Sequence, residues 1–184
     1  MIVSGVVLAW GDGTELLSGS TLVDHAASAL YGSGVVVSPI VAAGSSPHDS
    51  LHAALDRVAG ADVVVLHDAH RPLAPSSLVT RVFEAVRDGA DAAVPVVEVT
   101  ETVKEVDPAG RIVRTVPRES LLQVQFPQAV RGAVLAAGHR SCRPSDPLIP
   151  LGARVVTVPG APDAFAVFTP YDLELAAAVF AART

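Results

Sequence analysis

Apolar residues along this chain fall into short runs of strand length, and segments of helical periodicity lie between them. Several of the runs are rich in valine, which favours strands. The predicted strands cover 2–9, 35–40, 62–66 and 91–97, and the predicted helices cover 21–30, 47–58 and 76–86. This alternation predicts an α/β fold whose mostly parallel sheet carries helices on both faces.

The alternation ends near residue 100, where polar and apolar residues begin to alternate one by one. Residues 100–106 and 111–116 read as two antiparallel strands, and Asp107-Pro108-Ala109-Gly110 between them is a strong turn sequence. We therefore predict a protruding β-hairpin arm over about 98–118. Because an isolated hairpin is marginally stable in water, we expect the arm to pack on something, such as a second copy of the chain.

The remainder returns to strands and helices within one predicted domain, 1–184. Residues 121–124 are expected to rejoin the sheet, and an alanine-rich helix is expected over 130–139. The last predicted strands are 154–158 and 165–168, and a final helix begins at Pro170. No internal repeat or linker interrupts the sequence.

Composition narrows the possible functions. The 184 residues are 50% hydrophobic and 17% charged, with a net charge of -6. These values exclude a disordered tail and argue against nucleic-acid binding, because a phosphate backbone would be repelled on average. A single cysteine, Cys142, and the lack of a signal peptide or of an apolar run of about 20 residues predict a cytoplasmic protein without a membrane span.

Candidate chemistry lies just after the buried strand 62–66. Ligands of open α/β sheets bind at the carboxyl ends of parallel strands, which is where Asp68 falls. A carboxylate there can hold a divalent cation, although it could instead cap a turn. Arg71 offers a planar fork for a phosphate or carboxylate, although it could be an exposed charge.

Other candidates have equally strong structural interpretations. Gly44 and Ser50 bracket the start of a helix, where turn and cap roles are about as plausible as nucleotide contact. Each charge on the arm, taken alone, is expected to be solvated. Arg118 at the base of the arm is the best single candidate to turn inward. The other arm charges are Glu101, Lys104, Arg111 and Arg114.

Several motifs carry a resemblance to a known family. His67-Asp68-Ala69-His70-Arg71-Pro72 is similar to His-Asp-Ala-Ala-Arg-Pro, and Gln125-Phe126-Pro127-Gln128 is similar to Gln-Thr-Pro-Gln. Further similar segments are 49–51, 95–104, 115–118 and 163–173. In these motifs the chain resembles the methylerythritol phosphate cytidylyltransferase family of the non-mevalonate isoprenoid pathway.

The resemblance implies a three-layer, Rossmann-like nucleotidyltransferase fold. It implies an enzyme that joins CTP to methylerythritol phosphate, a sugar-alcohol phosphate, with magnesium as cofactor and release of pyrophosphate. It also implies a homodimer in which each arm completes the neighbour's site. The family's contacts fall on residues of this chain as follows: cytosine on Gly44 and Ser50, nucleotide and metal on Asp68, and sugar phosphate on Arg71, Thr102 and Arg118.

The departures from the family affect the triphosphate. The first loop is short, lacks a basic residue and carries Asp12 and Glu15, and Ala166 stands at the position of the family's last-strand lysine. Phe126 replaces a threonine, and Glu101 replaces an aspartate. Since cations facing the developing charge drive nucleotidyl transfer, no catalytic group is assigned, and catalysis is expected to be weakened or lost.

Two alternatives remain open from the sequence. One is a transferase with a changed donor or acceptor, which Asp68, Thr102 and Arg118 would support. The other is a non-catalytic ligand-binding or dimer-partner protein, which the arm would support.

Overall fold

The computed structural model of the chain describes residues 1–11, 15–138 and 153–183. The loop residue Asp12 and the single cysteine, Cys142, lie outside these ranges. Within them, no helix has the length and apolar character needed to cross a membrane.

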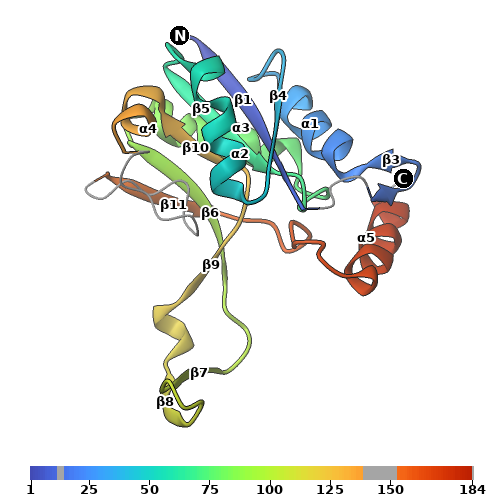
Figure 1. The fold of residues 1–184 in the computed structure, drawn as a ribbon, viewed down its shortest axis with the longest axis vertical. Helices are drawn as coiled ribbons and strands as arrows, with labels where there is room; N and C mark the ends of the chain where they lie inside the picture. Colours follow the sequence, from blue (N-terminus) through green and yellow to red (C-terminus); the bar gives the residue numbers. More distant parts are fainter. Residues whose placement is uncertain (12–14, 139–152, 184) are drawn as a thin grey trace.

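A seven-stranded sheet forms the centre of the molecule (Figure 1). Its order is β11-β6-β10-β5-β1-β4, and β9 pairs with part of β6. The strands of this sheet are β1 (Val3–Trp10), β4 (Ile40–Gly44), β5 (Val63–Asp68), β6 (Ala92–Glu98), β9 (Leu122–Val124), β10 (Gln128–Arg131) and β11 (Val155–Pro159). Because β10 is antiparallel to both β5 and β6, all strands except β9 and β10 run in one direction.

Helices cover both faces of this sheet and produce three layers. One core cluster joins the sheet to α1 and α3, and a second joins it to α2 and α4. The helices are α1 (Leu22–Gly32), α2 (Pro47–Ala54, continued by the 3-10 turn η1, Leu55–Val58), α3 (Ser76–Arg87), α4 (Gly132–Gly138) and α5 (Pro170–Arg183). The predicted α/β class with a mostly parallel sheet is confirmed.

Local signals fix the helix starts. Thr21 caps α1 by accepting the amide of Asp24 at 3.1 Å, and the Asp24 carboxylate accepts the amide of Thr21 in return. Ser46 caps α2 by accepting the amide of Asp49 at 3.1 Å, with Pro47 in the first turn. These side-chain caps satisfy amide groups that a helix start leaves without partners.

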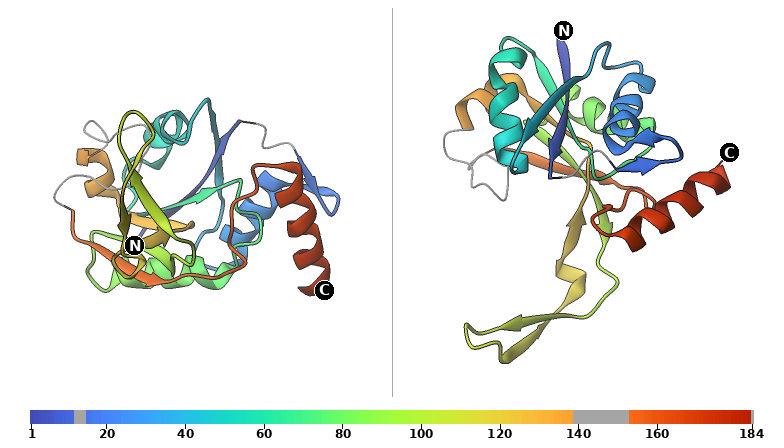
Figure 2. Two further views of the ribbon diagram at one scale, coloured as in Figure 1. Left: turned by 90° about the horizontal axis from the view of Figure 1, so that it is seen from below. Right: turned by 45° about the vertical axis from the view of Figure 1, so that its right-hand side comes forward.

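The predicted arm is present and projects away from the sheet (Figures 1 and 2). Its strands β7 (Val103–Val106) and β8 (Ile112–Val116) are antiparallel, and the turn at Asp107 joins them. The short turn η2 (Arg118–Ser120) leads back to β9. The arm's apolar side chains Val106, Ile112 and Val113 are 56–67% exposed, so nothing in the described chain covers them.

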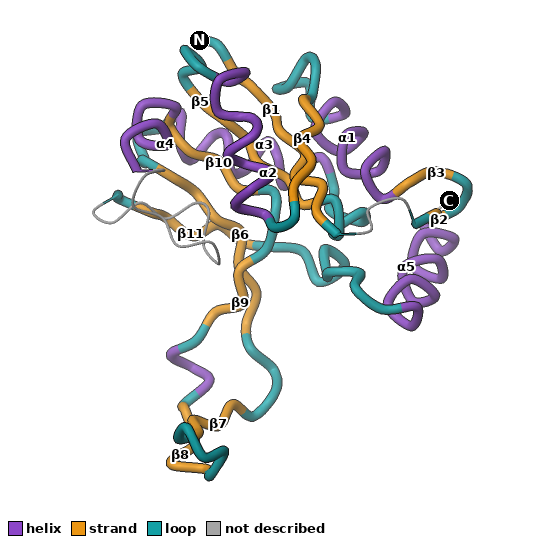
Figure 3. The backbone as a smooth tube through the Cα atoms, viewed as in Figure 1, coloured by secondary structure: helices purple, strands orange, loops and turns teal. Residues whose placement is uncertain are grey.

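The last helix lies beside the body rather than on the sheet (Figure 2). It packs against the small hairpin of β2 (Leu16–Leu17) and β3 (Ser20–Thr21) through a cluster that includes Leu17, Ala176 and Phe180. The segment from Gly160 to Thr169 therefore has to cross from the sheet edge at β11 to this outlying helix, as Figure 3 shows.

Three sequence predictions about strands were wrong. The second strand is 40–44 rather than 35–40, because Val36 packs into the notch at Gly5 instead of pairing. Residues 165–168 form no strand, since they lie in the crossing segment. A four-residue strand, β10, was missed, and it occupies the start of the helix that was predicted over 130–139.

Candidate functional site

The register of the sheet brings the candidate residues to one edge. β1 pairs with β4 so that Trp10 lies opposite Gly44, and with β5 so that Leu8 lies opposite Asp68. On the β5 side of β1, continuing this register by two residues beyond Asp68 brings His70 level with Trp10. Gly44, Trp10 and the turn after Asp68 thus form a row at the carboxyl ends of parallel strands, where ligands of such sheets bind.

Gly44 and Ser50 join β4 and α2 to β1. The hydroxyl of Ser50 is buried and donates to the carbonyl of Ala9 at 3.1 Å. A Cβ at Gly44 would overlap the backbone nitrogen of Ser50 and lie 2.8 Å from the Cβ of Asp49. Packing alone therefore requires glycine at position 44.

Asp68 is 6% exposed and holds the turn that follows β5. Its Oδ1 accepts the backbone N–H of His70 at 2.9 Å and lies 3.1 Å from Nδ1 of the same ring. Both of its hydrogen bonds within the described chain go to Oδ1, so Oδ2 is left for a further ligand. The Asp68 carboxylate therefore has a local turn-capping role and one spare acceptor.

A magnesium ion would have to rely on Asp68 and on the ligand itself. Among residues 1–11, 15–138 and 153–183, no group of three or more His, Cys, Asp or Glu side chains could hold a metal. Magnesium commonly binds through one or two carboxylates together with substrate phosphates. Asp68 fits that arrangement, provided that a nucleotide supplies the other oxygens.

Arg71 is half-buried and turns toward the crossing segment. Its Nη1 donates to the carbonyl of Ala164 at 2.7 Å, while Nε is buried without a partner in the described chain. Burial lowers the pKa of the guanidinium from its ordinary value, and the nearby Asp68 partly offsets this effect. Part of this side chain's donor capacity is therefore used to hold the protein together.

The arm residues lie apart from the sheet edge. Thr102 and Arg118 line a hollow of about 400 Å³ on the arm. Arg118 donates to the carbonyl of Thr100 at 2.7 Å, across the base of the arm. The fold thus brings Gly44, Ser50, Asp68 and Arg71 to the body, and Thr102 and Arg118 to the arm (Figure 1).

The remaining arm charges have local partners. Lys104 donates to the hydroxyl of Thr115 at 2.7 Å, and Arg111 pairs with Asp107 at 2.8 Å. Arg114 pairs with Glu105 across the hairpin. Glu101 is exposed. These contacts agree with the expectation that most arm charges are solvated.

Sequence reasoning missed an aromatic cluster at the same edge. The ring of His70 lies 4.5 Å from that of Trp10 and 5.0 Å from that of Phe168, between centroids. Phe168 follows Ala166, the position expected to carry a lysine, by two residues. Strand order could have paired Trp10 with His70, but nothing in the sequence indicated that the crossing segment would bring Phe168 to them.

His67 is fully buried and contributes to the core rather than to the edge. Neither ring nitrogen has a hydrogen-bond partner in the described chain. Burial lowers the pKa of this imidazole to about 4, because a charged ring would lose its hydration; Asp68 raises it and Arg71 lowers it further. His67 is therefore neutral at physiological pH.

Comparison with known proteins finds relatives of this chain. The family model of IspD, 2-C-methyl-D-erythritol 4-phosphate cytidylyltransferase, matches residues 23–182. An enzyme of that name from Frankia casuarinae is 45% identical over 88% of this chain and 61% of its own length. The enzyme of the same name from Rhodococcus jostii is 37% identical over 89% of this chain and 84% of its own length.

Solved structures extend the similarity to the fold. The Thermus thermophilus 2-C-methyl-D-erythritol 4-phosphate cytidylyltransferase is 28% identical, with a TM-score of 0.83 over all of both chains. The 4-diphosphocytidyl-2C-methyl-D-erythritol synthase from Anaerococcus prevotii is 17% identical with a TM-score of 0.87, and at this identity it supports the fold alone. The chain spans only 61% and 62% of the first two curated relatives' lengths. From the matching family model and these identities, the chain belongs to the 2-C-methyl-D-erythritol 4-phosphate cytidylyltransferase (IspD) family.

Proposed function

We propose that this chain binds CTP at the carboxyl edge of its sheet and transfers CMP to methylerythritol phosphate, at a rate well below that of an ordinary enzyme. The observation that carries the proposal is the position of Asp68. This carboxylate ends a buried strand in the same edge as Gly44 and Ser50 and keeps Oδ2 for a ligand. A nucleotide lying along this row would meet backbone groups and a carboxylate suited to magnesium.

Magnesium, held by Asp68 together with phosphate oxygens of CTP, would supply charge neutralisation to the triphosphate. The chain's own residues position the two substrates. Gly44 lets β4 and the start of α2 pack closely, and Ser50 ties α2 to β1 through Ala9. Arg71 carries a positive charge beside Asp68, although Ala164 already uses one of its N–H groups.

The low expected rate follows from the loss of the family's cations that would face the triphosphate, namely the basic residues of the first loop and the last-strand lysine. The only lysine in the sequence, Lys104, lies on the arm, and Ala166 carries no charge. Removing one group that stabilises developing charge commonly slows an enzyme on the order of 10²–10³-fold. The acidic first loop, with Asp12 and Glu15, would add repulsion.

The acceptor half of the site would need a second copy of the chain. Thr102 and Arg118 line one hollow on the arm, whereas Arg71 belongs to the body. Within one chain the arm points away from the sheet (Figure 2). We propose a homodimer in which the arm of one protomer brings Thr102 and Arg118 to the edge of its partner.

Pyrophosphate release from CTP, magnesium and methylerythritol phosphate tests this function. We expect slow release by the wild type and at least about tenfold faster release by Ala166→Lys, because the lysine restores a cation. Tyr171→Lys adds the same charge at a side chain that is 73% exposed and is the matched control; its rate should be unchanged. Absence of pyrophosphate release from both the wild type and Ala166→Lys would contradict a transferase and favour the non-catalytic ligand-binding alternative.

A further inference from the structure

An aromatic cluster of Trp10, His70 and Phe168 lies at the carboxyl edge. Each ring contacts the other two, with centroid distances of 4.5 Å, 5.0 Å and 5.6 Å. Such separations are typical of favourable tilted aromatic pairs. The cluster occupies the row that contains Gly44, immediately beside Asp68, so it is part of any surface that a ligand meets there.

The rings of His70 and Trp10 form the buried side of the cluster. The ring of His70 is fixed by Asp68, and His70 is only 6% exposed. Trp10 is half-buried, and its Nε1 is buried without a hydrogen-bond partner in the described chain. Two rings thus form a support that is itself largely removed from water.

Phe168 is delivered to this support by the crossing segment. The amide of Val167 donates to the carbonyl of His70 at 2.7 Å, and Arg71 holds the carbonyl of Ala164 at 2.7 Å. Phe168 nevertheless remains 57% exposed. A large apolar ring is therefore held at the ligand-binding edge by two other rings, with much of its surface open to solvent.

The same edge offers little to phosphate groups. Among the described residues, the arginine beside Asp68 is Arg71, which is half-buried and already bonded to Ala164. Two carboxylates, Asp68 and Asp49, lie on the neighbouring turns; hydrogen bonds from Ser45 and Ser46 lower the pKa of Asp49 and favour its charged form. Aromatic surface rather than positive charge is the feature that this edge presents.

We propose that the aromatic cluster binds the flat base of the nucleotide by stacking, so that affinity at this site comes from the base more than from the phosphates. This inference rests on the proposed function, because it names the part of the donor that the same site recognises. Stacking of a base on an aromatic side chain contributes enough to change affinity about tenfold or more when the ring is removed. It also depends little on salt, unlike recognition of phosphates.

Fluorescence of Trp10, the only tryptophan in the sequence, reports on this site directly. The full chain is titrated with cytidine, CMP, CTP and inorganic tripolyphosphate. We expect cytidine to bind within about tenfold of CTP at both low and high salt. Tripolyphosphate, which has the charge but not the base, should neither change the emission nor compete with cytidine.

Variants of Phe168 provide the second arm. Phe168→Ala should weaken binding of cytidine about tenfold, whereas Phe168→Tyr, which keeps the ring, should bind as the wild type does. Tyr171→Ala removes an exposed aromatic ring three residues away and should leave binding unchanged. Because the Phe168 side chain is exposed, its removal should not unfold the chain. The ligand titrations of the wild type test the stacking site independently of any variant.

The results separate this inference from the proposed function. Binding of CTP more than about a hundredfold tighter than cytidine, competition by tripolyphosphate, unaltered binding by Phe168→Ala, or no binding of cytidine would each overturn the stacking site. Binding of cytidine with the expected loss in Phe168→Ala, but without any pyrophosphate release, would overturn the transferase and support the stacking site.

Discussion

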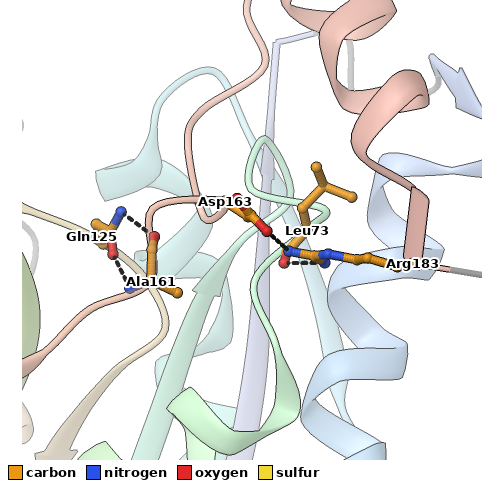
Figure 4. A network of polar contacts seen from close by, with 5 residues as sticks. All are labelled: Leu73, Gln125, Ala161, Asp163 and Arg183. Atoms are coloured by element: carbon orange, nitrogen blue, oxygen red, sulfur yellow. Dashed lines mark hydrogen bonds and ion pairs between the residues drawn. The ribbon is translucent and has the colours of Figure 1, made fainter. Parts of the chain in front are cut away.

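The side-chain amide of Gln125 exchanges two hydrogen bonds with the backbone of Ala161. Its Nε2 donates to the Ala161 carbonyl at 2.9 Å, and the Ala161 amide donates to its Oε1 at 3.0 Å (Figure 4). Nearby, Arg183 donates to the carbonyl of Leu73 at 2.8 Å and pairs with Asp163 at 2.9 Å. These contacts fasten the crossing segment that carries Phe168 to the body at two points.

Replacing Gln125 should destabilise the protein more than its position in a loop suggests. The side chain is 2% exposed, so Gln125→Ala leaves both backbone groups of Ala161 without their partner. We expect the free energy of unfolding to fall by about 2 kcal/mol, measured by denaturant titration. Gln123→Ala, at an exposed position of β9, is the control and should change it by less than about 0.5 kcal/mol. Equal losses in both variants would mean that the paired bonds contribute nothing.

The buried His67 should make stability depend on pH. In the unfolded chain its pKa is near 6.5, whereas in the folded chain it is about 4. Between pH 6.5 and 4 the imidazole binds a proton in the unfolded chain but not in the folded chain. The free energy of unfolding is therefore highest above pH 6.5 and falls as the pH falls toward 4. The contribution of this residue is about 3 kcal/mol over that window.

His67→Leu tests this dependence by removing the titrating group. Since neither ring nitrogen has a partner in the described chain, the variant should keep the wild-type stability at pH 7 within about 1 kcal/mol. Between pH 6.5 and 4, its free energy of unfolding should fall much less than that of the wild type. A His67→Leu profile identical to that of the wild type would refute the assignment.

Gly44→Ala should disturb the start of α2. The added methyl group would overlap the backbone nitrogen of Ser50, and backbone cannot move aside as a flexible side chain can. We expect a loss of about 2 kcal/mol, seen as a lower melting temperature. At Gly32 the same methyl group would meet only the movable hydroxyl of Ser76, at 2.9 Å, so Gly32→Ala should melt near the wild type.

Charge on the arm should break the proposed dimer without unfolding the protomer. Ile112 is 67% exposed in the described chain, so Ile112→Lys should leave the circular dichroism spectrum unchanged. If a second copy covers this surface, the variant should shift toward the monomer mass in light scattering, because an unpaired charge would be buried. Val37→Lys, at a position that is 81% exposed on the body, is the control and should keep the wild-type mass.

Much of the sheet followed from the sequence because local signals and long-range order agreed there. The valine run that leads into Asp68 predicts a buried parallel strand, and parallel strands place Asp68 at the same edge as the end of β4. The failure at β10 has a physical cause. Its four residues run directly into an alanine-rich helix, and only pairing with β5 and β6 identifies them as a strand.

The candidate site divides in the same way. Asp68 could be placed from its strand end, since its hydrogen bonds go to His70, two residues along the chain. Ser50 could be placed at the start of a helix, but its bond to Ala9 joins residues 41 apart in sequence. Phe168 could not, because its position depends on tertiary bonds from Val167 to His70 and from Arg71 to Ala164. The apolar run over 165–168 predicts a strand, but no strand pairs with it in the described chain.

The arm has a consequence for how this protein can vary. Glu98 on β6 is paired with Leu122 on β9, so the sheet closes beneath the arm and residues 99–121 leave and return at adjacent points. The entropic cost of such an excursion grows slowly with its length. A two-residue turn joining the paired strands could replace it without altering a single register of the sheet. The length and sequence of the arm can therefore change, and with them the partner that it contacts, without a change at the carboxyl edge of the sheet.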